Sequence, residues 1–316
     1  MSKISVIGAG AVGTATAYAL LIKEVASEIA LYDIDTQKVD AEVLDLAHGT
    51  QFTGSSRVIG GSDIAVTANS DLIIVTAGAK QKPGQTRLDL AEVNVKILQT
   101  LLPQLLAQSP KAIFMLVTNP CDVLAVVAQK ILGLPANRIF ASGTVLDSAR
   151  LRWTIAERFK VSSNSVHAYI VGEHGDSEFA LWSQTRIGPV PIADWQLDTG
   201  SVISHQELEQ MALDVKNAAY KVIAGKGATN YAIGLSATAI AQAIINDSNE
   251  VLSVSTVLDN YLGVSGVALS VPTIVNRSGA ARTVEVPMTE AEHAKFVASA
   301  AAIQKSLSSL GFDSKH

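Results

Sequence analysis

Residues 3–13 read Lys3-Ile4-Ser5-Val6-Ile7-Gly8-Ala9-Gly10-Ala11-Val12-Gly13 and predict the first unit of the fold. The apolar and β-branched first half favours a strand, and the glycines follow the pattern Gly-x-Gly-x-x-Gly, which permits a tight turn. The apolar stretch Val12–Ile22 comes directly afterwards and favours a helix. A strand, a glycine turn and a helix in this order indicate one unit of a parallel sheet covered by helices.

The same alternation continues through the first half of the chain. Runs such as Leu72-Ile73-Ile74-Val75 are apolar at every position, as expected for strands that helices cover on both faces. The predicted fold class is therefore α/β, with a doubly wound parallel sheet of the Rossmann type. The expected strands are Lys3–Ile7, Glu28–Tyr32, Arg57–Ile59, Leu72–Thr76, Ala112–Val117 and Arg138–Ala141, and the expected helices are Val12–Ile22, Gln37–His48, Leu88–Ala107 and Val123–Leu132.

The pattern changes after about Gly143, where longer helices mix with strands of alternating polarity. This change predicts two domains, a doubly wound domain of residues 1–143 and a mixed α+β domain of residues 144–316, with a cleft between them. In the second domain we expect helices at Leu146–Phe159, His205–Ala224, Ala232–Ile245 and Glu290–Leu310, and strands at Val166–Val171, Glu250–Asp259 and Gly266–Ile274.

Composition narrows the class of protein. Hydrophobic residues make up 48% of the chain and charged residues 17%, which favours a large buried core, and the net charge of −5 argues against nucleic acid or an anionic membrane as a partner. The chain enters a strand near Lys3, leaving no room for a signal peptide, and the apolar stretch Ala11–Ile22 is too short to span a membrane. Cys121 is the single cysteine, so we expect neither an intrachain disulfide nor a metal cluster held by several thiolates. A cytoplasmic protein is the simplest interpretation.

The glycine turn is followed by an acidic residue at the spacing that a dinucleotide site requires. Asp33 directly follows the second expected strand, about 20 residues after Gly13. Gly8 would allow the turn, Gly10 would let the backbone approach a pyrophosphate, and Gly13 would let the helix pack against the strand. The Asp33 carboxylate would accept hydrogen bonds from ribose hydroxyls and repel a 2′-phosphate, which favours NAD over NADP. The alternatives are that Asp33 caps the following turn, or that the unit belongs to a methyltransferase.

Three further segments carry groups suited to chemistry. Asp147 and Arg150 are three residues apart in an expected helix and therefore share a face. His174 stands between two glycines just after an expected strand. A polar loop containing glycine and proline runs from residue 77 to Arg87 and has the composition of a mobile lid. Each feature has a simpler explanation. Asp147 and Arg150 could form an ordinary surface ion pair, His174 could be structural, and Arg87 could merely begin a solvated helix.

Taken together, these motifs resemble the lactate/malate dehydrogenase family. The resemblance rests on the glycine turn, Thr-Ala-Gly-Ala at 76–79, Thr-Asn-Pro at 118–120, Leu-Asp-x-x-Arg at 146–150 and Gly-Glu-His-Gly-Asp-Ser at 172–177, which occur in family order over nearly the whole chain. It implies an oxidoreductase that moves a hydride between NAD and C2 of a short 2-hydroxy or 2-oxo acid, as in glycolysis and fermentation.

The resemblance also implies a role for each group. His174 is expected to be the general acid and base, because an imidazole titrates near operating pH, and Asp147 to orient its ring. Arg150 would hold the substrate carboxylate through two parallel N–H groups, and Arg87 would polarise the substrate carbonyl once the lid closes. The expected cofactor contacts are Gly8, Gly10, Val12, Gly13, Asp33, Thr76, Ala77, Gly78, Asn119 and Ile233, with Asn119 also near the substrate.

One lid position favours a particular substrate within the family. In the malate branch an arginine six residues before the mobile arginine pairs with the second carboxylate, and here that position is the neutral Gln81. A dicarboxylate would be desolvated without a partner, whereas Gln81 beside Thr229 would suit the methyl group of pyruvate or lactate. We therefore expect lactate chemistry. Malate or another 2-hydroxy acid is the second possibility, and a non-catalytic NAD-binding protein is the third.

Two cations point to regulation and assembly. Arg152 and His167 match positions that bind fructose 1,6-bisphosphate in many bacterial members of the family, at a two-fold axis. Unregulated members carry the same pair, so allosteric activation and its absence are both open. The first strand begins near Lys3, without the N-terminal arm of the vertebrate enzymes, which favours a homotetramer of the bacterial type, with a dimer as the alternative.

Overall fold

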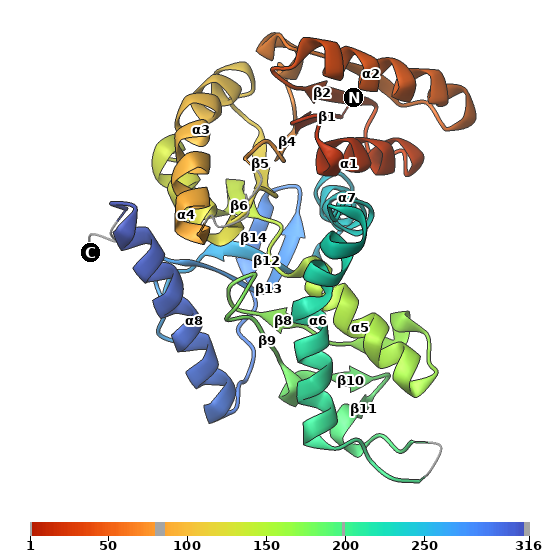
Figure 1. The fold of residues 1–316 in the computed structure, drawn as a ribbon, viewed down its shortest axis with the longest axis vertical. Helices are drawn as coiled ribbons and strands as arrows, with labels where there is room; N and C mark the ends of the chain where they lie inside the picture. Colours follow the sequence, from red (N-terminus) through yellow and green to blue (C-terminus); the bar gives the residue numbers. More distant parts are fainter. Residues whose placement is uncertain (1, 80–85, 198–199, 313–316) are drawn as a thin grey trace.

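A nine-stranded sheet forms the centre of the protein (Figure 1). The structure is a computed structural model. It describes residues 2–79, 86–197 and 200–312, and for Arg87 it describes the backbone but not the side chain. Six of its strands are parallel, in the order β6-β5-β4-β1-β2-β3. This confirms the predicted doubly wound fold. The strands are β1 (Lys3–Ile7), β2 (Glu28–Tyr32), β3 (Arg57–Gly61), β4 (Leu72–Val75), β5 (Ile113–Leu116) and β6 (Ile139–Ala141).

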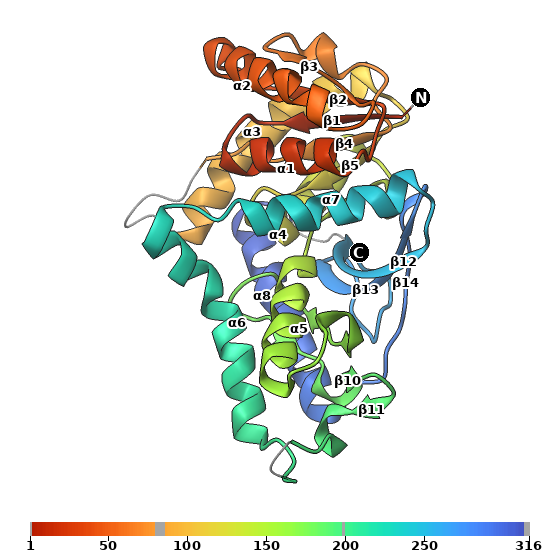
Figure 2. The ribbon, with the colours of Figure 1, turned by 90° about the vertical axis from the view of Figure 1, so that its right-hand side faces the viewer.

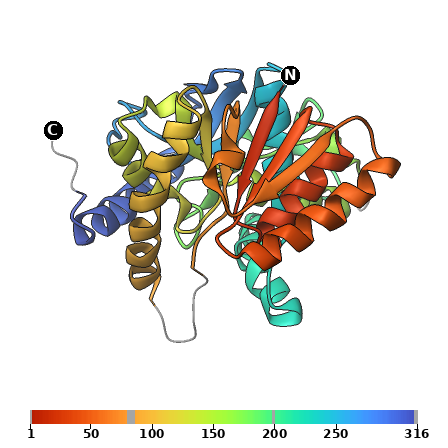
Figure 3. The ribbon, with the colours of Figure 1, turned by 90° about the horizontal axis from the view of Figure 1, so that it is seen from above.

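Helices cover both faces of the parallel strands, and for this reason β4 and β5 are buried at every position. Helix α1 (Ala11–Ile22) packs beside α7 (Tyr231–Ile245) on one face. Helices α3 (Arg87–Gln108) and α4 (Cys121–Leu132) pack on the other, and Figure 3 shows the two layers on either side of the strands. Helix α2 (Thr36–Gly49) lies along β3 and buries only Val39.

The sheet continues beyond the parallel strands. Strand β12 (Glu250–Val257) runs antiparallel to β6 through the pair Ser255 and Ala141, and β13 (Ala268–Asn276) and β14 (Gly279–Thr283) follow it. The residues expected to form a second domain therefore contribute three strands to the central sheet. This extension was not predicted.

The remaining elements form the lower part of the molecule in Figure 1. Helices α5 (Val145–Phe159) and α6 (His205–Lys226) enclose a third hydrophobic cluster, and α8 (Glu290–Ser309) lies against α4 and β13. Figure 2 shows α6 on the outside of this part and α7 against α1. The short strands are β7 (Val166–His167), β8 (Ile170–Val171), β9 (Phe179–Ala180), β10 (Arg186–Ile187) and β11 (Val190–Pro191).

One strand prediction was wrong. Val166–Val171 is not one strand, because β7 pairs with β10 in one small sheet and β8 pairs with β9 in another. The chain leaves the first sheet at Ala168, whose carbonyl accepts a hydrogen bond from Nε of Arg152 instead of continuing a ladder. Among the described residues, no helix combines the length and the apolar character needed to cross a bilayer.

Candidate active site

The glycine turn lies at the point where the order of the parallel strands reverses. Gly8 follows β1 and has a positive φ of 105°, and a Cβ atom there would approach Ala77 N, after β4, to 2.9 Å. A Cβ atom on Gly13 would lie 1.8 Å from the carbonyl oxygen of Gly8. A Cβ atom on Gly10, by contrast, would meet nothing within 4 Å. The turn is therefore tightly packed at both ends and open in the middle, where a pyrophosphate would approach.

The start of α1 offers free donors beside this opening. Its N-cap is Gly10, which makes no side-chain capping bond, so the first-turn N–H groups face outward with the positive end of the helix dipole. Val12, in that first turn, is half-buried. Asp33 Oδ2 accepts from Ala9 N at 2.6 Å and Oδ1 from Asp35 N at 3.0 Å. The carboxylate is thus fixed at the end of β2, where it caps the turn.

A buried asparagine that sequence reasoning missed connects the other two strand ends. Asn94 of α3 is 1% exposed; its Oδ1 accepts from Ala79 N at 2.8 Å, and its Nδ2 donates to Asn119 O at 2.7 Å. Thr76 donates to the carbonyl oxygen of Ile7 at 2.9 Å. The segment containing Thr76, Ala77 and Gly78 is therefore held beside Asn119, which precedes a cis peptide bond to Pro120.

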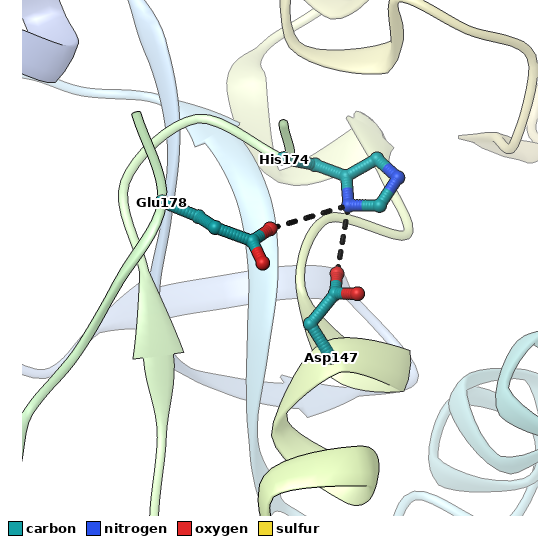
Figure 4. Close-up of side chains that lie close together, drawn as sticks. All are labelled: Asp147, His174 and Glu178. Carbon is teal, nitrogen blue, oxygen red and sulfur yellow. Dashed lines mark hydrogen bonds and ion pairs between the residues drawn. The ribbon is translucent and has the colours of Figure 1, made fainter. Parts of the chain in front are cut away.

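Asp147 and Arg150 project from the first turns of α5, as the three-residue spacing predicted. Arg150 Nη1 donates to Asp147 Oδ1 at 2.7 Å, and the Asp147 side chain is 2% exposed. A buried carboxylate is stable only when paired, and this one has two partners. Its second oxygen, Oδ2, lies 2.7 Å from Nδ1 of His174 (Figure 4).

His174 is carried by the loop between β8 and β9, and its position is fixed by the backbone. His174 N donates to Oδ2 of Asp122, a buried α4 residue, at 2.8 Å. The preceding Glu173 N donates to Ser299 Oγ of α8 at 2.7 Å. A Cβ atom on Gly172, which has a φ of 92°, would approach Ser299 Oγ to 2.9 Å. Two helices therefore clamp the loop, and the imidazole is presented with 27% of its side chain exposed.

The electrostatics of this pair favour a protonated ring. Burial lowers the pKa of His174, but the charge and hydrogen bond of Asp147 outweigh it and raise this pKa to about 9. Burial likewise opposes ionisation of Asp147, but His174 and Arg150 hold its pKa below the usual value. The resulting unit is an imidazolium and a carboxylate at neutral pH, with the other ring nitrogen, Nε2, left for a reacting atom.

Glu178 is a second carboxyl group at the same ring, and sequence reasoning missed it. Its Oε2 lies 3.8 Å from His174 Nδ1, and its side chain is 4% exposed (Figure 4). Ligand atoms of Asp147, His174 and Glu178 all lie within 4.8 Å of one another. The direct hydrogen bond between His174 and Asp147 favours proton chemistry at this cluster. The sequence held no distinctive signal for Glu178, because a glutamate before a strand is common.

A pocket of about 180 Å³ brings two of the five expected substrate residues, Asn119 and Arg150, together with the expected catalytic pair Asp147 and His174. Apolar side chains from α3 and α6, such as Leu90 and Ile223, also line it. Thr229 and Ile233, two further expected site residues that the structure describes, do not line this pocket. Ile233 is half-buried at the start of α7, whose Gly234 packs against Ala15 of α1. Gln81 lies outside the described residues, and Arg87 begins α3 with its side chain likewise outside the description.

The two expected effector residues lie close together on another surface. Arg152 bonds the carbonyl of Ala168, next to His167, and its guanidinium lies 5.0 Å from the ring centroid of Tyr169. His167 is exposed in β7, and its neighbour across the small sheet is Arg186 of β10. Three cationic or titratable side chains therefore lie at this edge.

The chain matches two family models in sequence order. The lactate/malate dehydrogenase NAD binding domain matches residues 2–141, and the lactate/malate dehydrogenase alpha/beta C-terminal domain matches residues 144–311. The curated L-lactate dehydrogenase of Bifidobacterium animalis subsp. lactis is 46% identical over 312 residues, which cover 98% of each chain. That of a Synechococcus species is 45% identical over 308 residues, covering 98% of this chain and 99% of the relative.

Solved structures give the same picture. A lactate dehydrogenase from a Medee basin deep-sea metagenome library has a TM-score of 0.94 at 38% identity, covering 98% of this chain and 99% of that one. The minor L-lactate dehydrogenase of Enterococcus mundtii has a TM-score of 0.93 at 38% identity, with 98% of each chain covered.

Proposed function

The chain belongs to the lactate/malate dehydrogenase family, and we infer that it is an NAD-dependent L-lactate dehydrogenase in which His174 is the general acid and base. The observation that carries this inference is the 2.7 Å contact between His174 Nδ1 and Asp147 Oδ2, at a pocket that Arg150 and Asn119 also line. A proton donor and a carboxylate-binding cation thus border one space. Hydride transfer to a 2-oxo acid requires both beside the cofactor.

His174 supplies the proton for the reaction. Bound NADH supplies the hydride that reduces C2 of pyruvate. His174 Nε2 donates its proton to the carbonyl oxygen, and in lactate oxidation the neutral ring takes the hydroxyl proton back. Asp147 fixes the tautomer with the proton on Nδ1 and stabilises the imidazolium. The hydrogen bond between Asp122 and the backbone of His174 supports this role, because it fixes the segment of the loop that carries the ring.

Arg150 and Arg87 bind the two polar ends of the substrate. Asp147 holds one N–H group of Arg150, and the remaining donors of the planar guanidinium suit a carboxylate. We assign Arg87, at the far end of the lid, to the carbonyl oxygen, where negative charge develops. The capping box between Thr86 and Asp89 supports this assignment, because it fixes where α3 begins. Asn119 lies beside Arg150 in the pocket and would contact both substrate and nicotinamide.

The cofactor is NAD, and the glycine turn fits it. The open space at Gly10 and the uncapped start of α1 suit the pyrophosphate, and Val12 would cover it from the first turn of the helix. Asp33 would accept from the adenosine ribose with its remaining lone pairs. Thr76, Ala77 and Gly78 would line the nicotinamide half, and Ile233 would pack against the ring.

Substrate preference follows from the neutral residue in the lid. Gln81 offers no charge for a second carboxylate, and Thr229 is small. The test compares steady-state turnover of pyruvate and oxaloacetate with NADH. A kcat/KM for pyruvate about 10²-fold or more above that for oxaloacetate is expected, since an unpaired buried charge costs about 3 kcal/mol or more. A preference for oxaloacetate would make the chain a malate dehydrogenase.

The assignment of the histidine needs its own experiment. His174→Asn keeps a polar side chain of similar shape but removes proton transfer at neutral pH. Turnover should fall by about 10³-fold or more, while NADH fluorescence shows unchanged cofactor binding. Substantial turnover in this variant would refute the role of His174 as acid and base. Loss of NADH binding in a folded variant would place the residue in the cofactor site instead.

We also propose a homotetramer in the cytoplasm, with the chain divided functionally into residues 1–143 and 144–316. Helices α1, α2 and α7, which Figure 2 shows side by side, form one face of the molecule, and each of them leaves large apolar side chains exposed. A face of this kind needs a cover, and a second copy of the chain would provide it. The exposed residues are Tyr18, Ile22, Leu44, Tyr231 and Leu235. Light scattering at four times the chain mass is expected, and a monomer would refute the assembly.

Activation by fructose 1,6-bisphosphate is the proposed regulation. Arg152, His167 and the neighbouring Arg186 would meet their symmetry mates and repel one another until phosphate binds between them. The expected result is a lower apparent KM for pyruvate when the bisphosphate is present. Superimposable saturation curves with and without it would remove this part of the proposal.

A further inference from the structure

Glu178 is a buried carboxyl group that the reaction above does not use. It enters β9 at the end of the catalytic loop, with 4% of its side chain exposed and Oε2 3.8 Å from Nδ1 of His174. Its other oxygen, Oε1, is buried and makes no hydrogen bond to any residue that the structure describes. Two carboxyl groups, Asp147 and Glu178, thus face one ring nitrogen, although only Asp147 accepts its proton.

Glu178 borders two separate spaces. One is the substrate pocket of about 180 Å³, and the other is a cavity of about 360 Å³ between the catalytic loop, α6 and α8. Trp182 lines this second cavity, and its buried Nε1 also makes no hydrogen bond within the described part of the chain. Glu178 therefore lies between the substrate pocket and this second cavity.

The groups around Glu178 determine when it carries a charge. Burial raises its pKa, and the negative charge of Asp147 raises it further, to about 8, against the opposing charges of His174 and Arg150. The other charged or titratable groups facing this region from the packed elements are Asp122 of α4, Lys216 and Glu209 of α6, Lys295 of α8, and Glu173 and Asp176 of the loop itself. Glu178 is therefore a neutral acid at neutral pH and becomes an anion in mildly alkaline solution.

We propose that Glu178 is a positioning residue that acts through His174, adding a second negative charge behind the imidazole and so extending the pH range over which the ring keeps its proton. This inference rests on the proposed role of His174 for its effect on turnover. At 3.8 Å an added unit charge favours the imidazolium by an amount worth about one pH unit or more, depending on the local dielectric. The imidazolium and the Glu178 carboxylate then stabilise each other, so the two groups titrate as a coupled pair.

The two directions of the reaction should respond together. Pyruvate reduction needs the protonated ring, so Glu178→Gln should move the alkaline limb of its kcat/KM profile to lower pH by about one unit or more. Lactate oxidation needs the neutral ring, so its rising limb should move by the same amount in the same direction. A residue that merely filled space would change the rates without displacing both limbs equally.

A matched control is available at the rim of the same cavity. Glu209 of α6 is 44% exposed and lies 3.7 Å from Lys295, so Glu209→Gln removes the same charge from a position remote from the ring. Its pH profile should coincide with that of the native protein. Glu178→Asp keeps the carboxylate but moves it away from the imidazole by one methylene group. The limbs of its pH profiles should therefore lie between those of the native protein and those of Glu178→Gln.

The direct measurement is the titration of His174 by NMR with ¹³C-labelled histidine, the signal being assigned by its absence in His174→Asn. Glu178→Gln should lower the midpoint in the resting protein, whatever His174 does in turnover. An unchanged midpoint would overturn the inference. If Glu178→Gln does not fold, the midpoint of Glu178→Asp must lie below the native value, and equality overturns the inference equally. A lowered midpoint with unmoved kinetic limbs would instead refute the acid–base role of His174.

Discussion

Nδ1 of His174 lies 2.7 Å from Oδ2 of Asp147, although the two residues are 27 positions apart and come from a loop and a helix. Asp147→Asn preserves the size of this partner and removes its charge. Without the carboxylate the pKa of His174 should fall, because burial is then opposed by less negative charge. We expect kcat for pyruvate to fall by about 10²- to 10⁴-fold and the alkaline limb to move to lower pH, as measured by stopped-flow NADH absorbance. A profile with the native limb would show that Asp147 does not control the ring.

Arg150 offers a second test on the same helix. Arg150→Lys keeps one positive charge but loses the planar pair of donors, and a lysine cannot bind Asp147 and a carboxylate in the same geometry. We expect the KM for pyruvate to rise by about 10- to 100-fold, equivalent to about 1.5–3 kcal/mol of lost hydrogen bonding. NADH affinity, measured by fluorescence titration, should stay within about twofold. A parallel loss of NADH affinity would mean that the side chain belongs to the cofactor site.

The fold could be predicted largely because each signal was local. The glycine turn, the run Leu72–Val75 and the helix Leu146–Phe159 lie where their periodicity indicates, since burial on both faces of a parallel strand leaves an unbroken apolar run. The break of Val166–Val171 into two strands could not be predicted, because it depends on a hydrogen bond from Arg152, 16 residues earlier. The joining of β12 to β6 depends likewise on one pair, Ser255 and Ala141, that no local pattern records.

The candidate site shows the same division. The motifs at 146–150 and 172–177 made it possible to predict Asp147, Arg150 and His174 as site residues, because the type and spacing of these side chains are distinctive. Asn94 and Glu178 escaped notice because an asparagine within a helix and a glutamate before a strand have no distinctive pattern. Their importance comes from burial and from contacts over long sequence separations.

Gly10 and Gly13 give a prediction that separates folding from cofactor binding. Gly13→Ala would place a Cβ atom 1.8 Å from the Gly8 carbonyl oxygen, so α1 must move, and the free energy of unfolding should fall by about 1–3 kcal/mol or more. Gly10→Ala meets no atom within 4 Å and should melt at the native temperature. Its methyl group would nevertheless fill the space proposed for the pyrophosphate, so NADH affinity should fall by about tenfold or more. Calorimetry measures the stability of both variants, and fluorescence titration measures their affinity for NADH. Unchanged NADH affinity in Gly10→Ala would show that the pyrophosphate does not bind at Gly10.

Asn94 tests whether the start of the lid depends on a buried amide. Asn94→Asp retains an acceptor for Ala79 N but replaces the donor to Asn119 O with a buried negative charge. A lost bond and an unsatisfied carbonyl cost about 2–3 kcal/mol, so the melting temperature should drop, and the KM for pyruvate should rise as Asn119 loses its support. Gln104→Glu introduces the same charge at an exposed site on the same helix and serves as the control. Equal stability of the native protein and Asn94→Asp would contradict the role of the amide.

Glu292 gives a pH dependence that belongs to the fold alone. Its carboxylate is 7% exposed and accepts from Ser183 N and Oγ and from Thr289 N, joining the start of α8 to the segment after β9. Burial opposes its ionisation, but these hydrogen bonds outweigh it and lower the pKa of Glu292. A lowered pKa means that the stabilisation is fully present above the unfolded-state value of about 4.3 and is lost as pH falls through the folded value. Glu292→Gln should therefore reduce the free energy of unfolding by about 1.5–3 kcal/mol at pH 7, and the difference from native should shrink below about pH 4. Urea unfolding at several pH values measures it, with Glu290→Gln, an exposed neighbour in the same turn, as control. A difference that stayed constant down to about pH 3 would show that the Glu292 charge contributes nothing to the fold.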